Sequence, residues 1–165
     1  MDVPADLEKK IDEVITHYPA SIRSATLPVL HLLQSHFGYL SLESVAWTAD
    51  KLGIEPINVY ELVTFYPGFR EKEPGKYHIR VCRTLSCAMA GSYGLMEELC
   101  RLAGIDRSGV SHANPIARSA DGRFSIEFAE CLASCGTAPV CLVNDDFHEN
   151  AQPQQAGEIL RQYGD

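Results

Sequence analysis

Apolar residues recur at the spacing of an amphipathic helix along the first third of the chain. Leu7, Ile11, Val14 and Ile15 fall on one face of a 3.6-residue period, and Pro19 ends this segment. Three further segments repeat the pattern, each with a polar residue where a helix cap is expected. They are predicted to run from Ser24 to Gly38, from Ser41 to Gly53, and from Asn58, with Glu61 completing a capping box, to Phe65. Four short helices that share an apolar stripe predict a small bundle.

The period of the pattern changes after residue 76. Tyr77, Ile79 and Val81 alternate with polar residues, as in a strand with one buried face. The other predicted elements are a helix at 91–103, strands at 124–128 and 139–143, and a closing helix at 156–163. The order β-α-β-β-β-α, with a hairpin-turn signal at Asp121-Gly122, predicts a compact α/β domain built in layers.

A charged stretch separates the helical part from the mixed part. The sequence GFREKEPGK, residues 68–76, carries Pro74 and Gly75 and is typical of a linker. We therefore expect two domains, a helical domain at 1–70 and an α/β domain at 77–165. The expected fold class is α+β, with a small N-terminal helical bundle followed by the α/β domain.

Composition and charge exclude several classes of partner. The 165 residues hold 14 Lys and Arg against 22 Asp and Glu, which gives a formal net charge of −8. Because no basic stripe is available to neutralise phosphates, no nucleic-acid partner is expected. No apolar run reaches the roughly 18 residues of a membrane span. The acidic, amphipathic N-terminus does not have the basic start or apolar centre of a signal peptide, so we expect a cytosolic location.

Four of the six cysteines form two pairs. Cys82 and Cys87 make a C-x₄-C motif, and Cys131 and Cys135 make a C-x₃-C motif. The first cysteine of each pair ends a predicted strand or closely follows one, and the second lies on the connecting loop. Neighbouring strands would deliver both loops to one edge of the sheet and gather the four sulfurs. Since four thiolates are the ligand set of iron–sulfur clusters, electron transfer is the leading hypothesis.

Three alternative roles for the paired cysteines stay open at this point. Zinc ribbons favour two-residue gaps, so gaps of four and three with 43 residues between the pairs fit them less well. A thiol–disulfide enzyme would carry C-x-x-C, which is absent. The four residues could also be unrelated buried cysteines. The remaining two, Cys100 in a predicted helix and Cys141 in a predicted strand, are expected to be buried packing residues.

Hydroxyl side chains flank both cysteine pairs. Thr84, Ser86, Ser134 and Thr137 can donate hydrogen bonds to sulfur, which would raise the reduction potential of a cluster. The alternative is that these residues only serve the turns in which they lie.

Four segments together resemble the small peripheral-arm [2Fe–2S] subunit of NADH:quinone oxidoreductase, the E-type subunit of respiratory complex I. These segments are LPVLHLLQSHFGYLS, VYELVTFYPGF, GKYHIRVCRTLSC and ECLASCGTAPVCLVND. Related subunits occur in NAD-linked hydrogenases and formate dehydrogenases. The resemblance covers about residues 5–145, and the combination of TFY, C-x₄-C and CLxxCGxAP is specific. One departure is the stretch NAQP at 150–153, where the family often has Leu-Thr before its last helix, so the docking of that helix is left open.

The resemblance implies a thioredoxin-like ferredoxin domain that follows the helical domain. It places Cys82, Cys87, Cys131 and Cys135 at the family's four ligand positions for one [2Fe–2S] cluster. FMN and NADH would bind a separate flavoprotein subunit, and the cluster would exchange electrons with the FMN. Beyond the resemblance, we hypothesise that the helical domain clamps that flavoprotein through apolar residues, including those at 64–69. The alternative is plain packing between the two domains.

The resemblance also implies a place in a larger assembly. The chain would be a subunit of an NADH dehydrogenase with no active site of its own, next to larger iron–sulfur subunits. It would lie peripherally at the inner face of the membrane, without a span. The alternatives are the equivalent subunit of an NAD-linked hydrogenase or formate dehydrogenase, a zinc-stabilised interaction module, and a freely diffusing ferredoxin.

Overall fold

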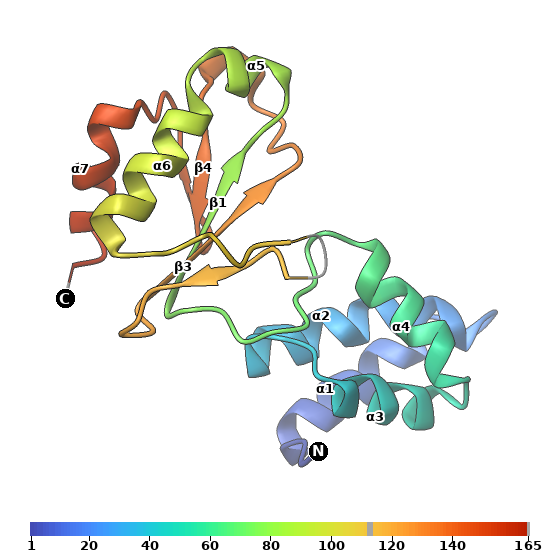
Figure 1. Cartoon of the computed structure of the whole chain (residues 1–165). Helices are drawn as coiled ribbons and strands as arrows, with labels where there is room; N and C mark the ends of the chain where they lie inside the picture. The colour runs from blue at the N-terminus through green and yellow to red at the C-terminus, as the bar shows by residue number, and fades with distance from the viewer. Residues whose placement is uncertain (112–113, 165) are drawn as a thin grey trace. The chain divides into compact units, whose positions relative to one another are not determined.

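The structure, a computed structural model, describes residues 1–111 and 114–164. The chain forms two compact units, one of residues 1–73 and one from Pro74 to the C-terminus. Each unit has an apolar core of its own. Figure 1 shows helices alone in the first unit and a sheet with helices in the second.

The first unit is a small bundle of helices, as the helical periodicity predicts. Its elements are α1 (Ala5–Thr16), η1 (Ile22–Ala25), α2 (Thr26–Phe37), α3 (Leu42–Leu52) and α4 (Pro56–Phe65). Ile11, Leu30 and Leu33 are fully buried where α1 and α2 meet the rest of the core. At about 25 cal/mol per Å² of apolar surface, this burial is the main stabilising contribution within the unit.

The ends of α3 follow from the sequence. The Ser41 hydroxyl accepts a hydrogen bond from the backbone N–H of Ser44 at 3.2 Å, which satisfies one of the open donors of the first turn. Gly53 ends the helix with φ of 62°, a left-handed conformation that costs glycine little. Both residues were predicted in these roles, and the predictions are confirmed.

The starts of α2 and α4 differ from the sequence prediction. Ser24 does not cap α2, because it lies within the 3-10 turn η1 that runs directly into the helix. The capping box predicted at Asn58 is also wrong, because α4 begins two residues earlier, at Pro56. Proline suits the first helical position, since its φ is already helical and its missing N–H would have had no partner there.

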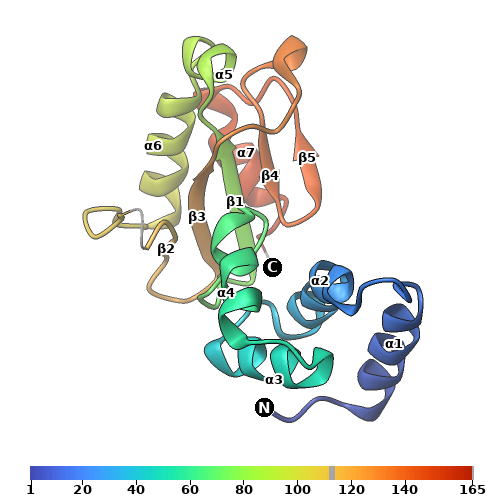
Figure 2. The same ribbon diagram turned by 90° about the vertical axis from the view of Figure 1, so that its right-hand side faces the viewer.

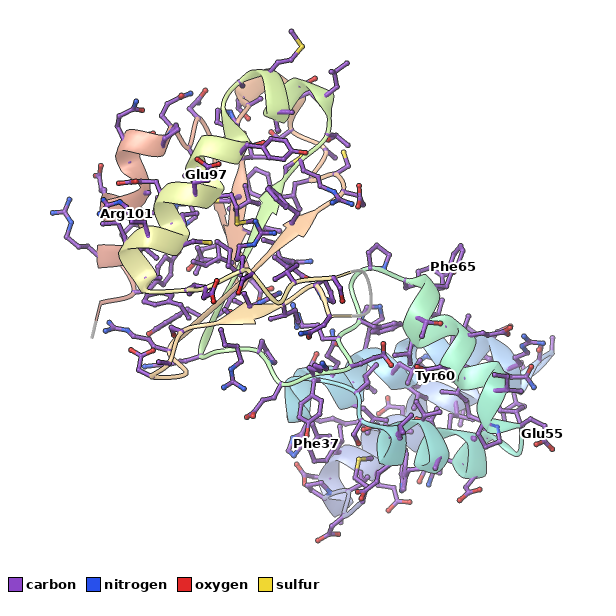
Figure 3. The ribbon with its side chains drawn as sticks, viewed as in Figure 1. Phe37, Glu55, Tyr60, Phe65, Glu97 and Arg101 are labelled. Carbon is purple, nitrogen blue, oxygen red and sulfur yellow. The ribbon has the colours of Figure 1, made fainter. Side chains whose placement is uncertain are left out.

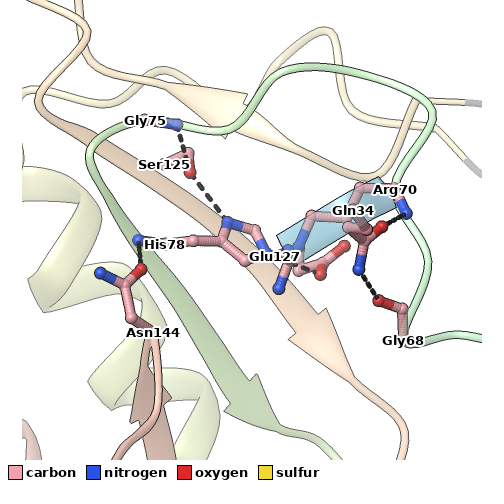
Figure 4. Close-up of polar contacts among 8 residues, drawn as sticks. All are labelled: Gln34, Gly68, Arg70, Gly75, His78, Ser125, Glu127 and Asn144. Carbon is pink, nitrogen blue, oxygen red and sulfur yellow. Dashed lines mark hydrogen bonds and ion pairs between the residues drawn. The ribbon is translucent and has the colours of Figure 1, made fainter. Parts of the chain in front are cut away.

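The segment after α4 folds back onto the bundle. Gln34 of α2 donates its amide N–H to the carbonyl of Gly68 at 2.9 Å and accepts from the backbone N–H of Arg70 at 2.8 Å (Figure 4). Phe69, between these two residues, is 8 % exposed, and its ring lies 4.8 Å from that of His31. Phe69 is therefore a core residue of the first unit and not a surface residue of the 64–69 segment.

The second unit contains a five-stranded sheet with the order β2-β3-β1-β4-β5, in which β1 and β3 are parallel and all other neighbours are antiparallel. Its strands are β1 (Tyr77–Cys82), β2 (Ala117–Arg118), β3 (Phe124–Ala129), β4 (Cys141–Val143) and β5 (Asp146–His148). Its helices are α5 (Leu85–Met89), α6 (Ser92–Ala103), η2 (Cys135–Thr137), η3 (Pro153–Gln155) and α7 (Ala156–Arg161).

One face of this sheet forms the core of the second unit. Ile79, Val81 and Ile126 are fully buried and pack with residues of α6 and α7, such as Leu95 and Ile159. Both helices therefore cover the same face (Figures 1 and 2). The alternation of apolar and polar residues predicts this arrangement, because successive side chains of a strand point to opposite faces. The α+β fold class is confirmed.

The last helix is docked. Ile159 and Ala156 of α7 lie in the core, with 4 % and 0 % of their surface exposed. A capping box precedes them, in which the backbone N–H of Gln152 donates to the side chain of Gln155 at 2.9 Å. The two glutamines thus supply a local start signal in a stretch that departs from the family pattern.

The opposite face of the sheet carries a buried polar network at the start of β1 (Figure 4). The ring of His78, 2 % exposed, lies 2.8 Å from the Ser125 hydroxyl and 2.9 Å from the Glu127 carboxylate, both on β3. The Ser125 hydroxyl also accepts from the backbone N–H of Gly75 at 2.8 Å. The side-chain oxygen of Asn144 accepts a hydrogen bond from the backbone N–H of His78 at 2.9 Å. This network fixes where the chain enters the sheet.

Replacement of Gly75 by alanine is expected to destabilise the second unit. An added Cβ would lie 2.6 Å from the carbonyl carbon of Phe124 and 2.8 Å from the amide nitrogen of Ser125, and neither backbone atom can move aside cheaply. We expect Gly75→Ala to lower the free energy of unfolding by about 1–3 kcal/mol, the usual cost of overpacking. Chemical denaturation measures this, with Gly109→Ala as control, since nothing lies within 4 Å of its added Cβ. Equal losses in both variants would contradict the prediction.

Candidate metal centre

The sheet topology brings the two cysteine loops to the same end of the second unit. Because β1 and β3 run parallel, the chain leaves both strands at the same edge, through Cys82 and through the residues after Ala129. The backbone N–H of Cys82 donates to Val140 at 3.1 Å, and that of Arg83 donates to Ala129 at 3.0 Å. In Figures 1 and 2, α5 and the loop around η2 both lie at this end of the sheet. The convergence of the two loops is as predicted.

The first pair of cysteines is buried. Cys82 and Cys87 are each 2 % exposed and share a small apolar cluster with Val140. Cys87 lies within α5, whereas the sequence predicts a loop there. On this helix Cys87 points inward, while Leu85 and Met89 are 75 % and 81 % exposed.

The second pair of cysteines faces solvent. Cys131 and Cys135 are both exposed and lie at either end of a tight turn. Between them Ala133 has φ of 58°, a left-handed conformation that costs a residue with a Cβ roughly 1–2 kcal/mol. In this conformation the backbone N–H of Ala133 donates to the sulfur of Cys131 at 3.3 Å. Backbone strain of this kind concentrates at functional sites.

The electrostatics of the buried pair favour one thiolate at Cys82. Burial acts to raise the pKa of the Cys82 thiol, but hydrogen bonds from the hydroxyl and backbone of Thr84 and from the backbone of Leu132 outweigh it, so that this pKa is lowered. The pKa of Cys87 is raised by burial and then by the neighbouring Cys82 and Cys135. The influence of Leu132 on Cys82, and of Cys135 on Cys87, reflects the proximity of the two loops. A bound cation would counter this mutual repulsion of the thiolates.

The other two cysteines lie elsewhere, in the core of the second unit. Cys141 is fully buried on β4, and burial raises the pKa of its thiol to about 12. Cys100 on α6 is 8 % exposed, and burial raises its pKa as well. Thiols held neutral in this way are poor metal ligands, because the thiolate is the binding form. The prediction that both are packing residues is confirmed.

The donor set of the two loops fits a cluster with two irons. Within residues 1–111 and 114–164, no three His, Cys, Asp or Glu side chains converge on one ion-sized site. A [2Fe–2S] cluster held by four cysteines requires only a pair of thiolates at each iron. Two cysteine pairs on loops at one end of the sheet supply that number of thiolates, and the Ala133 amide donates a hydrogen bond to a cysteine sulfur, of the kind that clusters receive.

The flanking hydroxyls divide into two groups. The Thr84 hydroxyl lies 3.2 Å from the sulfur of Cys82, as expected from the sequence. The hydroxyls of Ser134 and Thr137 instead lie 3.0 and 2.6 Å from the carboxylate of Glu149, a residue that sequence reasoning missed. No local motif could have found it, because Glu149 comes 12 residues after Thr137 and beyond two strands.

Replacement of Thr84 by valine is expected to lower the reduction potential of a cluster bound at Cys82. If Cys82 binds iron as a thiolate, the Thr84 hydroxyl is the donor of this pair, and such a bond stabilises the more negative, reduced state. Thr84→Val keeps the shape but removes the donor, so the potential should fall on the order of tens of millivolts. An EPR-monitored redox titration measures it. Ser86→Ala serves as the control. It removes an exposed hydroxyl from α5, the short helix that Thr84 precedes, and should leave the potential unchanged.

A family comparison decides what this arrangement is. The model of the thioredoxin-like [2Fe–2S] ferredoxin family matches residues 11–164. This chain belongs to that family. A [2Fe–2S] ferredoxin of thioredoxin-like fold is thus the class of protein that the paired cysteines and the motifs around them predict, and the predicted cofactor is the one for which the family is named.

Relatives of this ferredoxin share most of its length. The E-type subunit of the NADH-quinone oxidoreductase of Aquifex aeolicus (strain VF5) is 35 % identical over 162 residues, which cover 98 % of this chain and 96 % of the relative. The protein of the same name from Mycobacterium tuberculosis (strain H37Rv) is 35 % identical over 159 residues, and the chain spans only 60 % of its length. The resemblance to E-type subunits is confirmed.

A solved structure shares the ferredoxin's fold. It is the crystal structure of an NAD⁺-reducing [NiFe]-hydrogenase in the air-oxidised state, with a TM-score of 0.68 and 20 % identity. The match covers 84 % of this chain and 22 % of the hydrogenase chain. The thioredoxin-like α+β fold is therefore shared with part of a larger redox protein.

Proposed function

We propose that this ferredoxin is an electron-transfer subunit of an NADH:quinone oxidoreductase. The observation that carries the proposal is the pair of cysteine loops at one end of the sheet, in a chain that matches an E-type subunit over nearly its whole length. The described residues outside this end offer no comparable group of thiols, since Cys100 and Cys141 are buried singly. As a subunit of an oxidoreductase, the chain needs a carrier site and no acid, base or nucleophile.

Cys82, Cys87, Cys131 and Cys135 are the proposed ligands, two for each iron. When bound, the [2Fe–2S] cluster supplies a carrier that takes up and releases one electron. Cys82 and Cys87 would anchor it from the buried side, and Cys131 and Cys135 would hold it from the exposed turn. Because of this difference in burial, the second cysteine pair would lie on the side of the cluster that is closest to solvent and to an incoming partner.

The proposed partner is a flavoprotein subunit that binds FMN and oxidises NADH. The cluster held by these four cysteines would supply a one-electron acceptor for FMN reduced on the partner, with no bond formed or broken in this chain. Leu85 and Met89 of α5 supply exposed apolar surface at the end of the sheet that also carries the exposed turn of Cys131 and Cys135. We propose that α5 is part of this docking surface.

The two units are proposed to be separate domains, the helical one at 1–70 and the thioredoxin-like one at 77–165. The helical domain would make a contact of its own with the flavoprotein through exposed apolar residues of α4. Ile57 is 66 % exposed and Phe65 is 76 % exposed, and Figure 3 shows Phe65 at the end of α4, pointing away from the bundle. Phe69 takes no part, since it belongs to the core.

The proposed position is peripheral, on the cytoplasmic side of the membrane and next to larger iron–sulfur subunits. In the described part of the chain, no helix combines the length and the apolar character needed to cross a bilayer. An equivalent subunit of an NAD-linked hydrogenase or formate dehydrogenase is the second candidate. The shared fold of the hydrogenase chain favours it, whereas the name and 35 % identity of the full-length relative favour the quinone-linked complex.

The proposal is tested by reconstitution with the flavoprotein. The chain, loaded with its cluster, is mixed anaerobically with the FMN-binding subunit of the same organism, and NADH is added. We expect an EPR signal of the reduced cluster only when both proteins are present. Reduction by NADH without the flavoprotein, or no reduction with it, would contradict the proposed role.

A further inference from the structure

A carboxylate that no sequence motif predicts is attached to the turn between Cys131 and Cys135. Glu149 directly follows β5, and its Oε1 accepts a hydrogen bond from the Thr137 hydroxyl at 2.6 Å. The Ser134 hydroxyl lies 3.0 Å from the same oxygen and 2.7 Å from the oxygen of Thr137, so it donates to one of the two. The three side chains form a closed triangle.

Two members of this triangle flank Cys135, which is itself exposed. Ser134 immediately precedes it, and Thr137 comes two residues after it at the end of η2. Backbone bonds reinforce the attachment: the N–H of Asn150 donates to the carbonyl of Thr137 at 2.7 Å, and the N–H of Ala151 donates to that of Pro139 at 2.8 Å. Residues 149–151 therefore hold the cysteine turn from outside through both side-chain and backbone contacts.

The charge of Glu149 is fixed in this position. Hydrogen bonds from Thr137 and then Ser134 lower the pKa of the carboxyl group, so it is ionised at neutral pH. One-electron reduction of a cluster at these cysteines would add negative charge at the turn to which this exposed carboxylate is bonded. Like charges oppose each other, so the carboxylate disfavours the reduced state. The same bonds keep both hydroxyls away from the cysteine sulfurs, where they would have stabilised that state.

We propose that Glu149 is a positioning residue that holds the Cys131–Cys135 turn and keeps the reduction potential of the cluster low. This inference rests on the proposed function, since it requires a cluster at these cysteines. Glu149 touches neither substrate nor cofactor and acts through Ser134 and Thr137. A cluster of low potential returns its electron readily, which suits a carrier that exchanges electrons with a flavin.

The test compares three variants of the full chain, each reconstituted anaerobically and titrated with EPR detection. Glu149→Gln keeps an acceptor but removes the charge, and Glu149→Asp keeps the charge. Glu158→Gln is the matched control, because Glu158 of α7 is an exposed carboxylate that lines a surface pocket together with Glu149 and makes no hydrogen bond to the turn. We expect Glu149→Gln to raise the midpoint potential, so that the ratio of reduced to oxidised cluster at a fixed ambient potential rises severalfold. Glu149→Asp and Glu158→Gln should stay close to the unsubstituted chain.

A second readout does not require the cluster. In the metal-free chain, hydrogen exchange at the amides of Asn150 and Ala151 reports how firmly the turn is held. We expect faster exchange in Glu149→Gln than in Glu158→Gln. Equal exchange in the two variants would overturn the holding role, and equal potentials would overturn the electrostatic role. If Glu149→Gln does not retain a cluster, a potential in Glu149→Asp well above that of the unsubstituted chain would overturn the electrostatic role instead.

The two proposals fail in different ways. An unsubstituted chain that takes up no cluster defeats the proposed function and this inference together. An unsubstituted chain with a normal cluster, and a Glu149→Gln variant with the same potential, defeats only the inference.

Discussion

Cys131→Ser is expected to remove the cluster from an otherwise folded chain. Serine offers a harder oxygen ligand with a much higher pKa than a thiol, so the iron loses one of its proposed sulfur ligands. Cys131 is exposed, and its replacement leaves the core intact. We expect the iron that remains bound after desalting to fall by about tenfold or more, while the thermal unfolding of the metal-free chain is unchanged. Iron analysis and far-UV circular dichroism measure the two quantities.

The controls for this prediction are the two cysteines in the core. Cys141→Ala and Cys100→Ala remove a buried sulfur without placing a hydroxyl in an apolar site, which serine would do at Cys141. We expect both to retain the full iron content, although each loses some stability because of the small cavity. Loss of iron in Cys141→Ala, or its full retention in Cys131→Ser, would refute the ligand assignment.

A double replacement on α5, Leu85→Asp with Met89→Asp, is expected to stop electron exchange with the flavoprotein while the cluster stays in place. Both side chains are more than 70 % exposed, so neither contributes to the core, and Cys87 between them stays buried. Two carboxylates at an apolar contact would lose burial energy and add unpaired charge. We expect the Kd of the complex to rise about 100-fold or more, the effect of losing two strong contact residues.

Titration of binding to the flavoprotein tests this prediction, and the iron content shows whether the cluster survives. Leu102→Asp is the control, since Leu102 is a half-exposed leucine near the C-terminal end of α6. It should bind like the unsubstituted chain. A double variant that binds normally would exclude α5 from the docking surface.

The strands and the longer helices could be predicted because their side chains alternate over enough residues. Ile79 and Val81 on β1, and Ile126 on β3, repeat with the period of a half-buried strand, and Leu95 and Leu99 repeat with that of a helix. The parallel course of β1 and β3 could then be expected to place both cysteine loops at one edge. In these elements the local pattern and the tertiary packing agree, so the sequence is sufficient to predict them.

The short elements could not be predicted, because they are too brief to carry a period. The helix α5 has five residues, and two of its apolar side chains, Leu85 and Met89, face solvent, which conceals the buried face marked by Cys87. The strand β5 has only three residues. Such segments form because the neighbouring strand or loop offers hydrogen bonds, and that information lies elsewhere in the chain.

The hydrogen-bond partners of polar side chains could be predicted only where they lie close together in the sequence. Thr84 lies two residues from Cys82, so its hydrogen bond to the sulfur could be anticipated from the sequence. Ser134 and Thr137 also carry hydroxyls and lie within two residues of Cys135, yet their hydroxyls bond to Glu149. Only the return of the chain through β4 and β5 brings that carboxylate to the turn, and a fixed charge competes strongly for hydroxyl donors.

The most direct measurement is an iron and sulfide analysis, with an EPR spectrum, of the full chain after anaerobic reconstitution and reduction with dithionite. With four cysteine ligands, the chain should contain about two iron atoms and two sulfides and give the spectrum of a single unpaired spin. A colourless chain that binds zinc in place of iron, or one that gives no spectrum after reduction, would contradict the assignment of the two loops as a redox centre.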